Sequence, residues 1–241
     1  MRIIRTRDYD DMSRKTANMI AAQIMFKPDS LLGLATGASP IGAYKCLVED
    51  YKNGNVDFSK ISSVNLDEYH GIGADNDQSY HYFMNHHLFN HVNINADNVH
   101  IPDGLEPDAE KECAKYEEII RAKGGIDLLL MGLGLNGHIG FNEPAAELKL
   151  DAHCTGLSQT TIEANKKFFA DTSQMPLKAN TMGVGTIMRA RAILLIVSGE
   201  AKAKIVKEAF FGPITTQVPA SLLQLHHNFT IIGDEAAFSQ I

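Results

Sequence analysis

The stretch Leu31-Leu32-Gly33-Leu34-Ala35-Thr36-Gly37-Ala38-Ser39-Pro40 contains the pattern that decides the fold. Its first four residues are an apolar run of the kind that forms a buried strand, and residues 35–40 are a turn rich in small side chains. A helical pattern follows from Ile41 to about Tyr51. An apolar strand followed by a glycine-rich turn and a helix is typical of a parallel sheet covered by helices.

The same alternation returns along the rest of the chain. It predicts further strands and helices, with strands at 61–66, 126–131, 193–197 and 229–232 and helices at 108–123 and 200–210. We therefore predict an α/β fold in a single domain over residues 1–241. Its doubly wound, mostly parallel, Rossmann-like sheet has helices on both faces. Ligands of such sheets bind at the carboxyl ends of the strands, so the residues after each strand are the candidates for a site.

Composition excludes several classes of protein. The 241 residues include 22 Lys+Arg and 29 Asp+Glu, a formal net charge of −7 that argues against a nucleic-acid partner. The longest apolar run, residues 192–197, is far shorter than the roughly 18 residues of a membrane span. The cysteines Cys46, Cys113 and Cys154 form no CxxC pair. These features predict a cytoplasmic protein without a membrane partner.

The turn after the first predicted strand is a candidate anion site. The small residues Thr36, Gly37, Ala38 and Ser39 let an anion approach the backbone, and two of them add hydroxyl groups. Free N–H groups at the start of the following helix favour phosphate. An ordinary strand-to-helix turn remains the alternative.

Two adjacent carboxylates, Asp67 and Glu68, follow the strand at 61–66. Successive side chains on a strand face opposite ways, so the two cannot enter one site in the same manner. One is a candidate general base and the other a structural hydrogen-bond acceptor. The alternative is an exposed acidic turn.

The loop at 132–144 contains a GxGxxG pattern, yet a dinucleotide site is not expected there. That fingerprint must open a helix, and Gly140 and Pro144 would break one. A loop that presents His138 next to the carboxylate of Glu143 fits better, because a carboxylate fixes the tautomer of an imidazole and raises its basicity.

A lysine follows the strand at 193–197. Lys202 lies in the first turn of a predicted helix, where a cation is unfavourable unless an anion binds at the same helix end. An exposed surface lysine is the alternative. His87 and His91 are four residues apart, but there is no HExxH pattern, so we predict no metal site.

Together these motifs closely resemble the glucosamine-6-phosphate deaminases (isomerising), in their short bacterial form, along almost the whole chain. The matching motifs are GLATGASP at 33–40, NLDEYHG at 65–71, GLGLNGHIGFNEP at 132–144, TMGVGTIM at 181–188 and SGEAK at 198–202. The resemblance implies conversion of glucosamine 6-phosphate and water to fructose 6-phosphate and ammonia, in amino sugar catabolism. It implies no metal and no organic cofactor.

The resemblance also implies roles for individual residues. Asp67 matches the base that moves a proton between C2 and C1 of the sugar. His138 matches the residue that opens the pyranose ring, and Asn136 and Glu143 complete its relay. Lys202, Lys167 and the turn Thr36-Gly37-Ala38-Ser39 match the phosphate site.

Three departures from the family pattern have consequences. Some members have Asp where this chain has Asn136, and an amide can orient His138 but cannot ionise. Lys167 stands where many members have Arg, and Lys cannot make a bidentate contact with phosphate. Longer, hexameric members have a C-terminal extension and an allosteric site whose basic residues are replaced here around His153 and Thr155. We therefore expect a monomer or small homo-oligomer whose partner is a small-molecule sugar phosphate.

Two other functions compete with the deaminase. The 6-phosphogluconolactonases have a similar sugar-phosphate fold and a similar loop, although the combination of motifs at 65–69 and 141–144 favours the deaminase. A sugar-phosphate sensor without catalysis is the second alternative. The presence of Asp67, His138 and Glu143 together argues against it.

Overall fold

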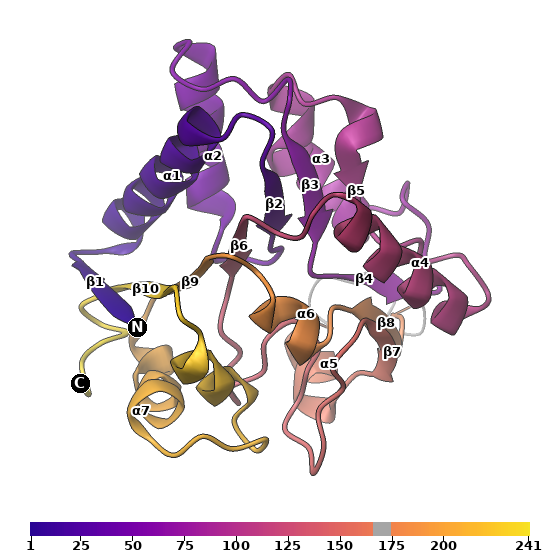
Figure 1. Cartoon of the computed structure of the whole chain (residues 1–241). Coiled ribbons are helices and arrows are strands. Elements are labelled where there is room, and N and C mark those ends of the chain that lie inside the picture. Colours follow the sequence, from indigo (N-terminus) through magenta and orange to yellow (C-terminus); the bar gives the residue numbers. More distant parts are fainter. Residues whose placement is uncertain (166–174) are drawn as a thin grey trace.

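The computed structural model describes residues 1–165 and 175–241. The main sheet of this part of the chain has seven strands, all of whose pairings are parallel (Figure 1). Their order across the sheet is β1 (Arg2–Thr6), β10 (Phe229–Asp234), β9 (Ile193–Val197), β6 (Leu128–Met131), β2 (Leu31–Leu34), β3 (Ser62–Asn65) and β5 (Val99–His100). The predicted parallel α/β sheet is thereby confirmed.

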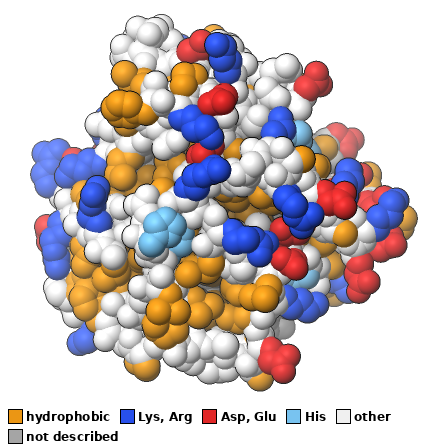
Figure 2. Space-filling view, viewed as in Figure 1, with side chains coloured by type: hydrophobic (Ala, Val, Ile, Leu, Met, Phe, Trp, Pro, Cys, Tyr) orange, Lys and Arg blue, Asp and Glu red, His pale blue; other side chains and the backbone are white. Residues whose placement is uncertain are grey.

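The helices that connect these strands follow the sequence signals. Asp108 caps α4 (Ala109–Ala122) by accepting a hydrogen bond from the N–H of Lys111, and Gly124 and Gly125 follow it at positive φ. Acidic and basic side chains are interspersed over α4 (Figure 2). The predicted helix at 200–210 is a 3₁₀ turn, η5 (Glu200–Lys202), continued by α7 (Ala203–Phe211).

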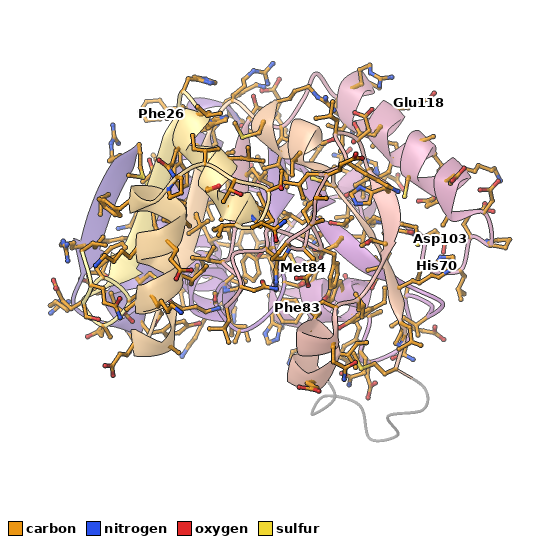
Figure 3. All side chains as sticks on the ribbon, turned by 90° about the horizontal axis from the view of Figure 1, so that it is seen from below. Phe26, His70, Phe83, Met84, Asp103 and Glu118 are labelled. Atoms are coloured by element: carbon orange, nitrogen blue, oxygen red, sulfur yellow. The ribbon has the colours of Figure 1, made fainter. Side chains whose placement is uncertain are left out.

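Some elements were not predicted. The longest of them is α1 (Tyr9–Phe26), which Asp8 caps. In Figure 3, Phe26 lies at the periphery, at the end of α1, whereas Met84 lies in the interior. The other helical segments are α3 (Tyr80–His87), η1 (Phe89–His91), η2 (Ala96–Asn98), α5 (Gln159–Asn165), α6 (Val184–Met188) and η6 (Pro219–Leu225). None of the described helices combines the length and the apolar composition that a membrane crossing requires.

A second, antiparallel sheet stands beside the first. Its strands are β4 (Asp67–His70), β8 (Lys178–Thr181) and β7 (His153–Gly156), with β8 in the middle. This sheet was not predicted: Asp67, which follows the predicted strand at 61–66, begins one of its strands. Leu66 joins the sheets: its N–H donates to Leu34 O, and its carbonyl accepts from Met182 N–H.

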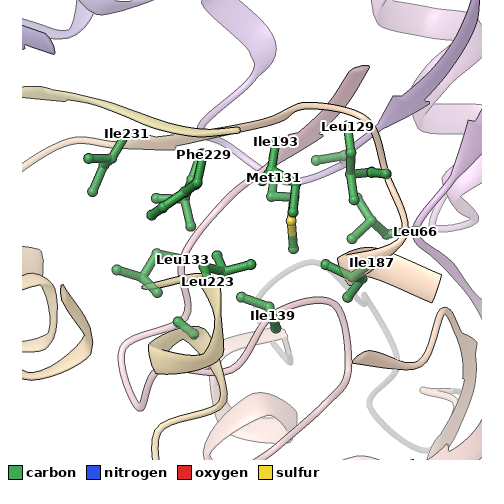
Figure 4. Packing of buried hydrophobic residues seen from close by; sticks show 14 of the residues in the cluster. Leu66, Leu129, Met131, Leu133, Ile139, Ile187, Ile193, Leu223, Phe229 and Ile231 are labelled. Carbon is green, nitrogen blue, oxygen red and sulfur yellow. The ribbon is translucent and has the colours of Figure 1, made fainter. Parts of the chain in front are cut away.

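Both faces of the main sheet are covered, as predicted. Leu32 and Leu34 of β2 pack in the core with α1 and α2 (Ile41–Lys52). On the other face, Leu129 and Met131 of β6 pack in the core that includes α4, α6 and α7 (Figure 4). The sheet is therefore a rigid middle layer, and its strand ends hold the loops that follow them in fixed positions.

Candidate active site

The residues predicted to carry the chemistry follow four neighbouring strands. In the sheet order, β9, β6, β2 and β3 lie side by side. Lys202 follows β9, the loop 132–144 follows β6, the turn 36–39 follows β2, and Asp67 follows β3. Since the strands are parallel, all four segments leave the sheet at the same edge (Figure 1).

The loop after β6 is the centre of this group. No helix follows its GxGxxG pattern, which agrees with the prediction that it is not a dinucleotide site. Gly137 has φ +84°, a conformation that favours glycine. A Cβ atom on Gly134 would lie 2.4 Å from the His138 ring, so only glycine leaves room for the imidazole.

Asn136 connects His138 to Glu143. Its Oδ1 lies 2.7 Å from His138 Nδ1, and its Nδ2 donates to Glu143 Oε2 at 2.6 Å. Glu143 Oε2 itself is 3.4 Å from His138 Nδ1. The carboxylate thus contacts the amide more closely than it contacts the imidazole.

This chain of contacts determines which ring nitrogen carries the proton. An ionised carboxylate only accepts hydrogen bonds, so the NH₂ group of Asn136 faces Glu143 and its oxygen faces His138. That oxygen also only accepts, so Nδ1 of His138 bears the hydrogen and Nε2 keeps its lone pair in the neutral ring.

Glu143 is held in its ionised form. Burial raises the pKa of this carboxyl, but the hydrogen bond and charge of His138, with hydrogen bonds from Thr161 and Asn136, outweigh burial and lower it to about 2. At neutral pH Glu143 therefore acts as a fixed negative charge that orients the relay, not as a proton acceptor.

Asp67 lies against the same loop. Its side chain is 8% exposed, and it pairs across β4 and β8 with Thr181. A Cβ atom on Gly140 would be 3.5 Å from Asp67 Oδ2 and 2.8 Å from Thr181 Oγ1. Burial, and then the negative charge of Glu68, raise the pKa of Asp67 to about 8. A carboxyl group with such a pKa is suited to take up a proton near neutral pH.

Glu68 has a different environment from its neighbour. It is 1% exposed, and its carboxylate accepts hydrogen bonds from the N–H groups of Tyr69, Tyr80 and His81 at 2.8–3.0 Å. The alternative of an exposed acidic turn was wrong. The two carboxylates differ as the alternation of strand side chains predicts: one accepts structural hydrogen bonds and the other is buried beside the loop.

The turn after β2 approaches the start of the same loop. A Cβ atom on Gly132 would lie 4.0 Å from Ser39 Oγ. Gly37 has φ +87°, and the start of α2 at Pro40 has no side-chain cap. The expected free N–H groups are only partly available, because the hydroxyl of Tyr9 accepts from Gly42 N–H at 2.9 Å.

Lys202, which follows β9, also contacts the start of the loop 132–144. Its Nζ donates to the carbonyl of Leu133 at 2.5 Å, and burial lowers its pKa. The alternative of an exposed surface lysine does not fit this half-buried side chain. Lys167, the other basic residue expected here, lies outside the described residues.

Sequence reasoning missed several residues around the site. Ser158 and Thr161 donate to Glu143 Oε1 at 2.9 and 2.5 Å, and Thr181 Oγ1 accepts from Phe141 N–H at 3.1 Å. Thr181 had a signal, because it opens one of the recognised motifs. Across the described ranges, no three His, Cys, Asp or Glu side chains are grouped as a metal would need.

Sequence comparisons with known proteins point to one family. The family model described as glucosamine-6-phosphate isomerases/6-phosphogluconolactonase matches residues 7–232. A glucosamine-6-phosphate deaminase of Thermoanaerobacter sp. (strain X514) is 52% identical over 100% of this chain and 95% of its own length. One of Clostridioides difficile (strain 630) is 51% identical over 100% of this chain and 97% of its own.

Solved structures lead to the same family. A monomeric glucosamine-6-phosphate deaminase superposes with a TM-score of 0.97 at 39% identity, covering 100% of both chains. The 6-phosphogluconolactonase of Trypanosoma cruzi superposes with a TM-score of 0.82 at 19% identity, over 100% of this chain and 96% of its own, which shows a shared fold. The chain belongs to the glucosamine-6-phosphate isomerase/6-phosphogluconolactonase family.

Proposed function

We propose that this chain is an enzyme of amino sugar breakdown that isomerises and deaminates glucosamine 6-phosphate to fructose 6-phosphate and ammonia. The observation that carries the proposal is the convergence of Asp67 and the His138–Asn136–Glu143 chain of contacts on one loop. The full-length relatives with about half of their residues identical carry the same activity in their names.

Ring opening is the first step. The pyranose has no carbonyl group, so the proton on the O1 hydroxyl must leave and the ring oxygen must gain one. We assign this transfer to His138, because Nε2 of its neutral ring has the free lone pair. Glu143 and Asn136 keep the ring in that tautomer without taking the proton themselves.

Isomerisation follows at the open-chain aldehyde. Asp67 removes the proton from C2, the ammonium group on C2 gives a proton to the carbonyl oxygen at C1, and an enolamine forms. The carboxylic acid returns a proton to C1, which leaves an iminium at C2. Water adds to C2, and ammonia leaves as the ketone forms. Because burial disfavours the Asp67 carboxylate, the ammonium of the substrate would stabilise its ionised form when it binds beside it.

The phosphate group supplies binding energy far from the reacting carbons. We assign its binding to Lys202, Lys167 and the turn Thr36-Gly37-Ala38-Ser39. The position of Ser39 near Gly132 and the contact of Lys202 with Leu133 support a site at the start of the loop 132–144. Such remote contacts orient the sugar for proton transfer.

The remaining expectations concern partners and location. The proposed steps use proton transfers by side chains alone and call for no cofactor. The interspersed charges over α4 give no support for a basic nucleic-acid surface on that side (Figure 2). We propose a cytoplasmic monomer or small homo-oligomer; the relative that superposes with a TM-score of 0.97 is described as monomeric.

A direct assay tests the proposal. The purified chain should release ammonia and form fructose 6-phosphate from glucosamine 6-phosphate, and it should not open 6-phosphogluconolactone at a comparable rate. Asp67→Asn should abolish exchange of the C2 proton with solvent deuterium while the variant still binds substrate. Lactone opening without ammonia release would favour the lactonase, and binding without turnover would favour a sensor.

A further inference from the structure

The two oxygens of the Glu143 carboxylate have separate sets of partners. Oε2 accepts from Asn136 in the same loop. Oε1 accepts from Thr161 at 2.5 Å and from Ser158 at 2.9 Å. Both hydroxyl groups belong to the segment after β7, which lies outside the loop that carries His138. A second part of the chain therefore fixes the carboxylate.

Thr161 is the better placed of the two hydroxyl groups. Its side chain is 6% exposed, and its hydroxyl makes the shorter contact with Glu143. The Ser158 hydroxyl accepts from the N–H of Thr161 at 3.2 Å, and it also lies 3.0 Å from Thr161 Oγ1. Ser158 thus supports the backbone turn that places Thr161.

We propose that Thr161 is a positioning residue for ring opening, which acts by holding Glu143 and, through it, the amide of Asn136. This inference rests on the proposed function. The Thr161 hydroxyl fixes the rotation of the carboxylate, so that Oε2 faces the amide. The amide then presents its oxygen to Nδ1 of His138.

Loss of the Thr161 hydroxyl would act on the tautomer of His138. Oε1 would keep only the contact with Ser158, so the carboxylate can rotate away from Nδ2 of Asn136 and release the amide. A released amide can present its NH₂ group to Nδ1, which then cannot carry a hydrogen. The proton moves to Nε2, and the neutral ring loses the lone pair that faces the substrate.

The test compares Thr161→Val with Thr161→Ser. Valine keeps the shape without the hydroxyl, so kcat for glucosamine 6-phosphate should fall about 10- to 100-fold while KM changes less than about 2-fold. Serine restores the hydroxyl and should recover most of kcat. Thr155→Val, on the neighbouring strand β7, is the matched control and should keep the activity of the parent.

A binding measurement separates positioning from damage to the site. The open-chain alcohol 2-amino-2-deoxyglucitol 6-phosphate has no ring to open, so Thr161→Val should bind it with an unchanged Kd. A weakened Kd, a kcat within 2-fold of the parent, or a serine variant as slow as the valine variant would overturn the inference. If Thr161→Val does not fold, Thr161→Ala carries the same expectations. A parent chain that releases no ammonia would refute the proposed function itself, which is a different outcome.

Discussion

Replacing Asp67 by Asn tests whether the proposed base occupies a site that disfavours its ionised form. Burial and the charge of Glu68 raise the pKa of this carboxyl from 3.8 to about 8 on folding. The folded chain therefore prefers the protonated side chain. The stabilisation that the folded chain gains from this protonated side chain is complete below the pKa of Asp67 in the unfolded chain. It is lost as the pH rises toward 8. The amide of Asn has the same shape and never ionises.

The magnitude follows from the size of the shift. One pKa unit corresponds to about 1.4 kcal/mol. Because the unfolded chain loses the Asp67 proton first, the free energy of unfolding of the parent should be lower than that of the fully protonated chain by about 4 kcal/mol at pH 7 and about 1.5 kcal/mol at pH 5. The stability of Asp67→Asn relative to the parent should therefore increase by about 2.5 kcal/mol between pH 5 and pH 7. Any effect of the amide on packing is the same at both pH values and cancels.

Urea unfolding of parent and variant at pH 5, 6 and 7 measures this change by linear extrapolation. Asp57→Asn serves as a pH-independent control, because the hydrogen bonds of Ser59 N–H and the Asn93 side chain lower the pKa of Asp57 below its ordinary value of 3.8. That carboxyl is ionised in both the folded and the unfolded chain from pH 5 to pH 7, so the stability of Asp57→Asn relative to the parent should stay constant over this range. A difference between Asp67→Asn and the parent that stays constant from pH 5 to pH 7 would refute the reasoning.

Three further predictions concern activity and regulation. Gly134→Ala should lower kcat by about 10-fold or more, because the new Cβ would lie 2.4 Å from the His138 ring. Steady-state kinetics measure this change, and an unchanged kcat would contradict it. Lys202→Met should raise KM for glucosamine 6-phosphate about 10-fold or more by removing a charged contact with phosphate, and an unchanged KM would remove Lys202 from that site. Saturation curves should be hyperbolic with or without N-acetylglucosamine 6-phosphate, because burial lowers the pKa of His153 and leaves it uncharged at pH 7. The cavity of about 480 Å³ beside it is lined by four acidic side chains, Glu110, Glu117, Glu118 and Asp151, and by two basic ones, Arg121 and Lys149. A sigmoidal curve that the acetylated sugar makes hyperbolic, or a hexamer in light scattering, would contradict the last prediction.

The middle of the main sheet could be predicted because several of its strands are apolar on both faces, whereas β1 and β5 were not predicted. The runs of β2, β6 and β9 are continuous, and α4 has clear signals at both ends. The second sheet could not be found in this way. Its strands have the short, polar sequences DEYH, HCTG and KANT, and they form through pairing between distant segments rather than through local preference.

In the site, too, contacts within one short loop could be predicted, whereas contacts between segments distant in the sequence could not. The spacing within the loop 132–144 was enough to predict that His138 and Glu143 lie together. The contact of Thr161 with Glu143 depends on where α5 lies after β7, and the burial that raises the pKa of Asp67 depends on β8. Neither is encoded in the spacing of nearby residues, so sequence reasoning could not find them.

The pairing of β1 with β10 has a consequence for synthesis on the ribosome. In the described sheet, β1 lies at the edge, and β10 is its neighbour in the ladder. Residues 229–234 emerge roughly 220 residues after β1, which at about 5–20 residues per second leaves β1 unpaired for tens of seconds. Its backbone N–H and C=O groups meanwhile remain open to other nascent chains or to chaperones. Slow emergence of the last strand therefore exposes the first one to aggregation.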